Sequence, residues 1–363
     1  MSKKIYIDAS GGQTYGSKFH IRSFVKYFTE VNDKDKLTVF VKQDYLNIKH
    51  DNLKIVVVSA IKFKVLRILF STIILPLICL FRRVDTIYYP FDVGSFMPIN
   101  TKIILGIKNP NFILPSYLVT LKYSGIHKFV SKTSSFFSNT LLFPSQTALN
   151  EISKHLHNVS NKKFIYHGLD FGDWINSNKA QKLTKNKYIF FCSNMYKFKN
   201  IEVLITAISH INHNSEEKMD LILCGDFVDD SYKLKIFSMI DEFDIKNRVI
   251  FLSKLSRSTI VNLYQNSELI VIPTKFETFG HMYLESLYSR RPVVVAETII
   301  ANEIVKNSVL YFKADDYMQL SNIIIEKEYL KNHSKRMKRG IDIVENFSIK
   351  RECEELYNLV LDY

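Results

Sequence analysis

The chain has 363 residues, of which 47% are hydrophobic and 13% aromatic, with only 11 glycines and 8 prolines. This composition excludes a disordered or linker-dominated chain, and the length predicts two domains of roughly 150 to 200 residues each. The net charge of +13 is uneven, because residues 1–180 hold 24 Lys and Arg against 11 Asp and Glu, whereas residues 181–363 hold 25 of each. The first half is therefore expected to face a membrane, a nucleic acid or a charged substrate, unless the excess only reflects a Lys-rich proteome.

The four cysteines indicate a reducing compartment. Cys79, Cys192, Cys224 and Cys353 lie far apart, show no metal-ligand spacing and fall mostly within apolar runs, as buried thiols do. The sequence also passes from two lysines directly into a strand pattern, without an apolar signal segment. We expect a cytoplasmic protein, either free or at the inner face of the membrane.

Short apolar, β-branched runs recur along the chain and predict strands. In the first half they cover residues 4–9, 37–42, 53–59, 86–90, 101–107, 140–145 and 162–168. In the second half they cover residues 187–193, 220–226, 248–253, 269–274, 292–297 and 308–312. Apolar strands without alternation, separated by helix-length segments, are typical of parallel sheets covered on both faces. The predicted fold class is α/β, with two doubly wound, Rossmann-like parallel-sheet domains.

A polar stretch at residues 173–187 lacks a strand pattern and predicts the domain boundary. We expect a first domain at residues 1–175, a second at residues 176–340, and a final helix at residues 341–363 that packs back toward the first domain. Open α/β sheets bind ligands at the carboxyl ends of their strands. Two such domains facing each other are therefore expected to hold a ligand in the cleft between them.

The most apolar run is residues 68–81, and basic residues flank it, among them Lys64, Arg67, Arg82 and Arg83. Its fourteen residues are fewer than the roughly 20 that span a bilayer. Two interpretations stay open. The run is either a buried helix of the first domain or an interfacial segment whose basic flanks meet lipid phosphates.

The stretch at residues 275–297 carries the residues best suited to chemistry. A strand ends before it, and we expect a helix to begin around Phe279 with Thr278 as its N-cap. The unpaired amides of Phe279, Gly280 and His281 would then attract a phosphate, and Gly280 would let a ligand approach the backbone closely.

Glu277 lies just before this predicted helix start, and Glu285 lies about two turns into the helix. Because carboxylates repel phosphate, they are better suited to accept hydrogen bonds from the hydroxyls of a sugar. The alternative is a salt-bridged surface helix, in which such a spacing of glutamates arises by chance.

The context of this pair resembles a known family. A strand, Pro-Thr, Glu277, Phe-Gly, Glu285 and then Pro-Val-Val are similar to the Glu-x7-Glu segment of glycosyltransferase family 4, retaining nucleotide-sugar transferases of GT-B fold. Residues 188–208 are similar to the phosphate-binding segment of that family, and residues 248–274 to its base-side segment. The glycine-containing residues 8–24 look like the loop after its first strand.

The resemblance implies a role for each matching residue. Glu277 would bind hydroxyls of the donor sugar, Glu285 the ribose, and Lys199 the diphosphate, where a flexible point charge neutralises the leaving group. The backbone at residues 278–281 would hold the sugar and the diphosphate. Gly11 and Gly12 would let the first domain approach the same phosphates.

The chain departs from the family pattern at several places, among them Arg290 and Arg291 in place of the small residues usual before Pro292. Asn194 stands where the family usually has an Arg, so that either Lys197 substitutes for it or the donor site is weaker or inactive. Lys108 and Asn109 follow the fifth strand where the family often has a His, and they are acceptor-side candidates. His20, His127 and His167 are interpreted as structural or solvent-facing.

The resemblance implies a retaining, metal-independent glycosyltransferase without a cofactor. The donor would be a nucleoside diphosphate sugar, and the acceptor a hydroxyl of a glycan or lipid-linked glycan in surface polysaccharide or glycoconjugate synthesis. A peripheral contact with an anionic membrane through the basic first domain is expected. No Asp-x-Asp follows a strand to hold a metal, and no recognition helix or zinc spacing supports nucleic-acid binding. The alternative is a catalytically weak or inactive nucleotide-sugar-binding relative.

Overall fold

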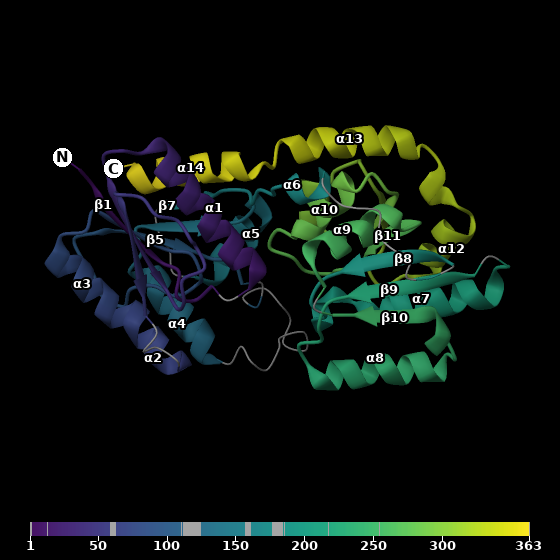
Figure 1. The fold of residues 1–363 in the computed structure, drawn as a ribbon. Coiled ribbons are helices and arrows are strands. Elements are labelled where there is room, and N and C mark those ends of the chain that lie inside the picture. The colour runs from purple at the N-terminus through teal and green to yellow at the C-terminus, as the bar shows by residue number, and fades with distance from the viewer. Residues whose placement is uncertain are drawn as a thin grey trace. The chain divides into compact units, whose positions relative to one another are not determined.

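The computed structural model describes residues 2–12, 14–58, 63–109, 111, 125–156, 161–175, 184, 186–216, 218–253 and 255–362. They form two compact units (Figure 1). Unit 1 holds the described residues up to 111, residues 125–168 and residues 348–362, and unit 2 holds residues 169–347.

The sheet of unit 1 contains seven strands. They are β1 (Lys4–Asp8), β2 (Lys36–Val41), β3 (Leu53–Val57), β4 (Thr86–Tyr89), β5 (Lys102–Gly106), β6 (Thr140–Phe143) and β7 (Asn161–Phe164). Their order is β3-β2-β1-β4-β5-β6-β7 and every pairing is parallel. All seven predicted strands of the first half are confirmed.

Helices cover both faces of this sheet. They are α1 (Tyr15–Val31), α2 (Lys64–Leu69), α3 (Leu75–Arg82), α4 (Gly125–Phe136), α5 (Gln146–Ile152) and α14 (Ile349–Leu361). One core joins strand residues such as Ile5 and Ile7 to Phe24 of α1 and Leu356 of α14. The other joins Ile87 and its neighbours to Phe70, α3 and α5. The central strands therefore bury apolar side chains on both faces, which explains the unalternating sequence pattern.

Unit 2 is built in the same way around six parallel strands. They are β8 (Lys187–Cys192), β9 (Met219–Cys224), β10 (Val249–Leu252), β11 (Leu269–Ile272), β12 (Val293–Ala296) and β13 (Leu310–Phe312), in the order β10-β9-β8-β11-β12-β13. Its helices are α6 (Gly172–Ile175), α7 (Ile201–Asn214), α8 (Asp230–Glu242), α9 (Arg257–Asn266), α10 (His281–Tyr288), α11 (Ile299–Ile304), α12 (Tyr317–Ile325) and α13 (His333–Glu345). The order reverses between β8 and β11, so the sheet is doubly wound as predicted.

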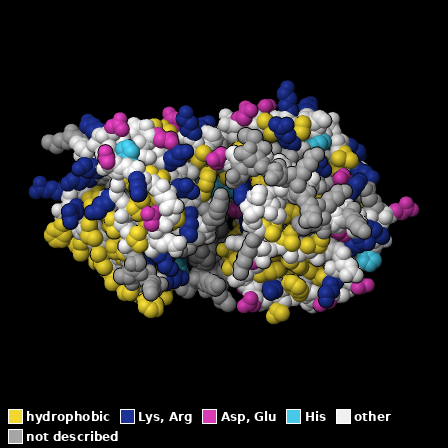
Figure 2. Space-filling view, in the orientation of Figure 1, with side chains coloured by type: hydrophobic (Ala, Val, Ile, Leu, Met, Phe, Trp, Pro, Cys, Tyr) yellow, Lys and Arg dark blue, Asp and Glu magenta, His cyan; other side chains and the backbone are white. Residues whose placement is uncertain are grey.

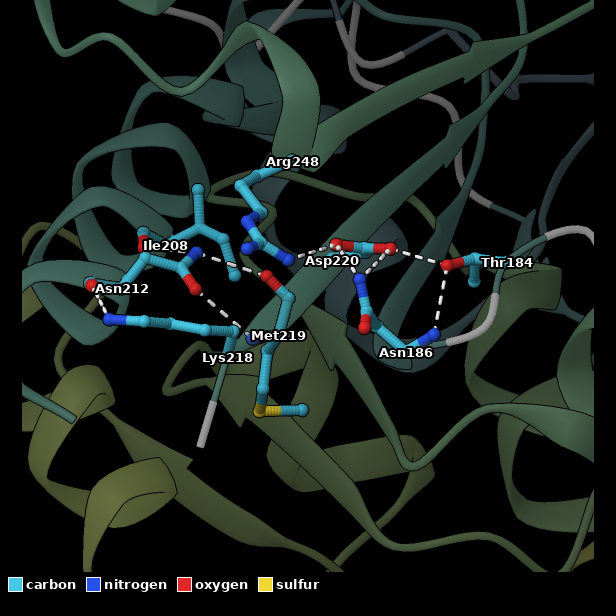
Figure 3. A network of polar contacts seen from close by, with 8 residues as sticks. All are labelled: Thr184, Asn186, Ile208, Asn212, Lys218, Met219, Asp220 and Arg248. Atoms are coloured by element: carbon cyan, nitrogen blue, oxygen red, sulfur yellow. Dashed lines mark hydrogen bonds and ion pairs between the residues drawn. The ribbon is translucent and has the colours of Figure 1, made fainter. Parts of the chain in front are cut away.

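A network of polar contacts lies at the edge of this second sheet where its strands begin (Figure 3). The buried carboxylate of Asp220, at the start of β9, accepts hydrogen bonds from Thr184 and Asn186 before β8 and from Arg248 before β10. Because these residues join the beginnings of three neighbouring strands, the network fixes the strand ends opposite to the edge where α/β sheets bind ligands.

Two segments differ from the sequence predictions. The apolar run predicted at residues 68–81 belongs to a longer continuous helix, Lys64–Arg82, of 19 residues, with a mean hydropathy of 2.1 over an 18-residue window. By length and composition alone this helix is long and apolar enough to cross a membrane, and 33% of that window is buried within the structure. At the other end of the chain, α13 still belongs to unit 2, and the helix that packs in unit 1 is α14.

Candidate functional site

The candidate site lies at the carboxyl edge of the sheet of unit 2. The loop after β8 meets the turn after β9, since Met195 N–H donates to the carbonyl of Asp226 at 2.9 Å. Gly225 adopts a φ of 133°, and a Cβ there would lie 2.2 Å from the carbonyl oxygen of Ser193. Only glycine therefore allows these two loops to approach each other so closely.

Lys199 and Glu277 meet at this edge. Lys199 ends a short helical turn after β8, and Glu277 lies in the loop after β11. Their side chains form an ion pair and are only 6% and 11% exposed. Lys275 N–H donates to the carbonyl of Phe198 at 3.0 Å and so fastens the two loops together. The structure thus brings together the two residues that the sequence assigned to catalysis.

The helix after this loop begins two residues later than predicted. The helix α10 starts at His281, and its N-cap is Gly280, with a φ of 81°, rather than Thr278. A Cβ at Gly280 would lie 2.8 Å from the ring of Tyr283, so glycine is required here by both conformation and space. Phe279 is 2% exposed and lies 5.9 Å from the ring of Phe347, so its side chain packs in the core.

Glu285 forms hydrogen bonds with two other side chains of unit 2. Its carboxylate accepts hydrogen bonds from Arg257 at 2.5 Å and from Tyr264 at 3.0 Å. The guanidinium of Arg257 lies 5.9 Å from the ring centre of Trp174, within cation–π range. Burial, and then the charge of Glu285, raise the pKa of Tyr264 well above its usual value. Sequence reasoning missed Arg257 and Tyr264, which lie about 20 to 30 residues before Glu285 without a motif.

The departure at Asn194 leaves an exposed amide side chain in the loop after β8. Lys197, the residue suggested as a substitute for the usual Arg, forms an ion pair with Asp229 at 3.4 Å. Asp229 is itself the N-cap of α8. The ammonium of Lys197 is therefore already committed to a neighbouring helix.

In unit 1, the loop after β1 packs against an aromatic ring. A Cβ at Gly12 would lie 2.7 Å from the ring of Phe91, and one at Gly11 would lie 3.3 Å from it. The two glycines thus have a packing reason to be small, in addition to the phosphate approach that the resemblance implies.

Lys108 and Asn109 follow β5 at the carboxyl edge of unit 1. Both backbone N–H groups donate to the carboxylate of Asp92, at 2.9 and 3.2 Å. Burial raises the pKa of Asp92 to about 6 against these hydrogen bonds. Burial also lowers the pKa of Lys108 to about 8. Lys108 lines a small pocket, partly open to solvent, with His20, His167 and Glu352.

These last three residues form a cluster that sequence reasoning missed. Oxygen Oε1 of Glu352 lies 2.7 Å from Nδ1 of His20 and 2.6 Å from Nδ1 of His167, and Oε2 accepts from Gly168 N–H at 2.8 Å. Burial lowers the pKa of both histidines, while the histidines lower that of Glu352 despite its burial. Two neutral imidazoles therefore donate to one carboxylate and tie α14 to α1 and to the segment after β7.

The three side chains could also ligate a metal, since their ligand atoms lie within 4.8 Å of one another. However, both Nδ1 atoms are taken up by Glu352, and the charge of Lys108 acts on both histidines. This arrangement favours a structural role for His20, His167 and Glu352, which are called the clasp below. The expected metal independence of the protein stays a prediction.

Residues 173–341 match the model of the family described as glycosyl transferases group 1. The chain carries a group 1 glycosyltransferase domain. The match confirms the glycosyltransferase assignment made from the Glu-x7-Glu segment, and the matched residues contain Lys199, Glu277 and Glu285.

Curated relatives of this glycosyltransferase domain agree with the match. The O-antigen chain mannosyltransferase RfbU of Salmonella typhimurium is 27% identical over 56% of this chain and 55% of its own length. An uncharacterized glycosyltransferase of Methanocaldococcus jannaschii is 24% identical over 63% of this chain and 62% of its own length. The alignments thus span little more than half of these relatives.

Solved structures share the fold over nearly the whole chain. Sucrose-phosphate synthase from Thermosynechococcus elongatus aligns with a TM-score of 0.76 at 12% identity, covering 98% of both chains. The Anabaena protein HepE, solved in complex with UDP and glucose, aligns with a TM-score of 0.74 at 15% identity, covering 99% of this chain and 100% of its own. The two parallel-sheet units therefore have the GT-B fold, as predicted.

Proposed function

We propose that the protein is a retaining glycosyltransferase that transfers a sugar from a nucleoside diphosphate sugar to a hydroxyl of a glycan or lipid-linked glycan acceptor. The observation that carries the proposal is the buried ion pair of Lys199 with Glu277, three residues before the Gly280 cap of α10. The group 1 domain and the UDP complex of the structurally similar HepE support this choice of donor.

The ion pair explains how the site receives its ligand. Without a donor, Lys199 neutralises Glu277 in a place where an unpaired charge is costly. A diphosphate brings negative charge that can take over the ammonium. Glu277 is then released to accept hydrogen bonds from the sugar hydroxyls. The N–H groups at the start of α10 add positive potential for the phosphates, and no metal is needed to balance them.

The second carboxylate is proposed to bind the ribose. Both oxygens of Glu285 are already engaged by Arg257 and Tyr264. Ribose hydroxyls would therefore join or replace the contact with Arg257. Trp174 lies beside this guanidinium and offers an aromatic wall near the nucleoside.

The reaction needs no protein nucleophile. The bond from the anomeric carbon to the diphosphate oxygen breaks, and the bond to the acceptor oxygen forms on the same face of the sugar. The acceptor proton passes to the departing diphosphate oxygen. The work of the protein is then positioning and stabilisation of the leaving charge. We assign the acceptor to unit 1. The positive charge of this unit favours a protein that acts in the cytoplasm at the inner face of a membrane.

Turnover measurements test the proposal. The donor is first chosen from a panel of nucleoside diphosphate sugars by thermal shift, because a ligand of the folded state raises apparent stability. Lys199→Ala and Glu277→Ala should each lower kcat by roughly 10²-fold, the scale of a lost charge-stabilising contact. Lys235→Ala, which removes an exposed lysine paired with Glu202 on α7, should leave kcat unchanged. Rates near that of the wild type in the first two variants would overturn the proposal.

A nucleotide-sugar-binding relative without activity is the second candidate, favoured by Asn194 in place of the usual Arg. It predicts a saturable thermal shift with a donor but no hydrolysis or transfer with any donor and acceptor pair. Detectable hydrolysis that Lys199→Ala abolishes would exclude it.

A further inference from the structure

An exposed apolar surface lies on unit 1, on the helix Lys64–Arg82 and on α4. On the helix Lys64–Arg82 and just before it, the most exposed apolar residues are Phe63 (71%), Val65 (75%) and Phe81 (81%), with Leu66, Leu69, Ile73, Ile74, Leu77 and Leu80 between them. On α4 they are Ile126 (67%), Phe129 (64%) and Phe136 (62%). These twelve residues are called the docking face below.

The two helices that carry the docking face lie side by side. Burial, and then the charges of Lys64 and Arg67 on α2, lower the pKa of His127 on α4, so the two helices are close at this end. The segment between β4 and β5 bridges them, because Phe96 N–H donates to the carbonyl of Thr72 and Gly94 N–H donates to the hydroxyl of Ser134. Figure 2 shows hydrophobic side chains gathered where α2, α3 and α4 lie in Figure 1, with Lys and Arg beside them.

The helix Lys64–Arg82 is held along the unit by its opposite side. Phe70, Leu75 and Cys79 are at most 7% exposed and belong to the core under the sheet. A helix of 19 residues is about 28 Å long, close to the thickness of a bilayer core. Since one side is fixed in a folded core, the exposed side is suited to lie on an interface and not to cross it.

The charge around the docking face has one sign. No Asp or Glu occurs at residues 63–84 or 125–136. Basic residues at the ends and margins are Lys64, Arg67, Arg82, Arg83, Lys128 and Lys132. Long basic side chains beside an apolar surface can reach the phosphates while their stems stay in contact with the hydrocarbon. Apolar patches of this kind are rare on monomeric proteins unless something binds them.

We propose that the docking face seats unit 1 on an anionic lipid bilayer, with the helix Lys64–Arg82 and α4 lying in the interface and the basic margin on lipid headgroups. Apolar insertion supplies binding that persists in salt, and each basic residue near the surface adds an attraction that salt weakens. By contrast, Leu234 of unit 2 is 72% exposed on a helix of mixed charge and serves as a control. The proposal rests on these contacts and does not depend on the transfer reaction.

Flotation of the full chain with vesicles tests the apolar part. Wild-type protein should float with phosphatidylglycerol/phosphatidylcholine vesicles at low salt and much less with phosphatidylcholine alone. The triple variant Phe63→Ser/Phe81→Ser/Phe129→Ser should lose roughly ten-fold or more of its vesicle affinity, whereas Leu234→Ser should bind as the wild type does. Thermal melting of each variant confirms that it is folded.

The charged part needs its own variants. Lys64→Gln/Arg82→Gln should weaken binding to anionic vesicles and reduce its salt dependence, and Lys246→Gln/Lys331→Gln on unit 2 should not. In a Trp174→Phe background, Phe81→Trp should give a blue-shifted emission that brominated lipids quench.

Several results would overturn the proposal. They are no flotation of the wild type at low salt, a folded triple variant that binds as well as the wild type, and self-association through this face without vesicle binding. Because donor binding and turnover are measured without vesicles, failure of this proposal is distinguishable from failure of the proposed function.

Discussion

The carboxyl edges of the two sheets hold buried charge in different ways. In unit 2, Lys199 pairs with Glu277 and Arg257 with Glu285, so each carboxylate faces a cation from another loop or helix. In unit 1, Glu352 faces two neutral imidazoles and a backbone N–H. An ion pair can exchange its anion for a phosphate, whereas the two imidazoles that contact Glu352 in unit 1 are held neutral by burial. The difference assigns ligand exchange to unit 2 and the fastening of α14 to unit 1.

The clasp in unit 1 can be broken at its centre. Glu352→Gln removes the charge that both histidines contact, and it should lower the free energy of unfolding by roughly 2–4 kcal/mol. Denaturant unfolding measures this. Glu355→Gln on the same helix removes an exposed pair with Arg351, and it should change stability by less than about 1 kcal/mol. Equal effects of the two substitutions would show that the contacts of Glu352 do not stabilise the fold.

Acid should loosen the same clasp. Burial lowers the pKa of His20, and it lowers the pKa of His167 to about 3. As the pH falls, the unfolded chain therefore binds protons at these histidines before the folded chain does. Stability is therefore full above about pH 6.5 and falls as the pH decreases, by at most about 1.4 kcal/mol per pH unit for each histidine. Melting temperatures between pH 7.5 and 4.5 measure the slope. His20→Gln/His167→Gln should flatten it, and an unchanged slope would contradict the assignment.

The glycine loop of unit 1 offers a smaller perturbation. Gly12→Ala places a Cβ where the ring of Phe91 lies, and it should cost about 1–3 kcal/mol of stability by overpacking. Gly16, within α1, has nothing within 4 Å of an added Cβ. Gly16→Ala should therefore be neutral or slightly stabilising. If Gly12→Ala were as well tolerated, the packing reason for this glycine would be wrong.

The smallest expected effect concerns the departure in unit 2. Asn194 is exposed in the loop after β8, so Asn194→Arg should add one charge for the phosphates and tighten donor binding by up to about ten-fold. Isothermal titration with the selected donor measures this. Weaker binding would indicate that the donor site is adapted to the amide side chain of Asn194.

The sequence predicted the parts of the fold that depend on local pattern. All thirteen strands were recognisable because each is a short apolar run between polar segments, and Lys199 and Glu277 because the family motif covers them. The start of α10 was misplaced because the left-handed cap at Gly280 replaces the side-chain cap expected from Thr278. The extent of the helix at Lys64–Arg82 was underestimated because its polar ends mask its continuity.

Other features depend on contacts that no local pattern records. His20, His167 and Glu352 are more than 140 residues apart along the chain and meet only once α14 packs in unit 1. Arg257 reaches Glu285 only because α9 and α10 flank the same edge of the sheet. Such pairs could be inferred from the sequence only with knowledge of the fold.

Calorimetric titration with a nucleoside diphosphate tests the exchange at Lys199 most directly. The wild type, Glu277→Gln and Lys199→Ala are titrated with whichever of UDP, GDP and ADP stabilises the wild type most. Because Glu277 competes with the diphosphate for the ammonium, Glu277→Gln should bind the nucleotide at least as tightly as the wild type, while Lys199→Ala should lose roughly ten-fold or more in affinity. Unchanged affinity in Lys199→Ala, or an equal loss in both variants, would contradict the account.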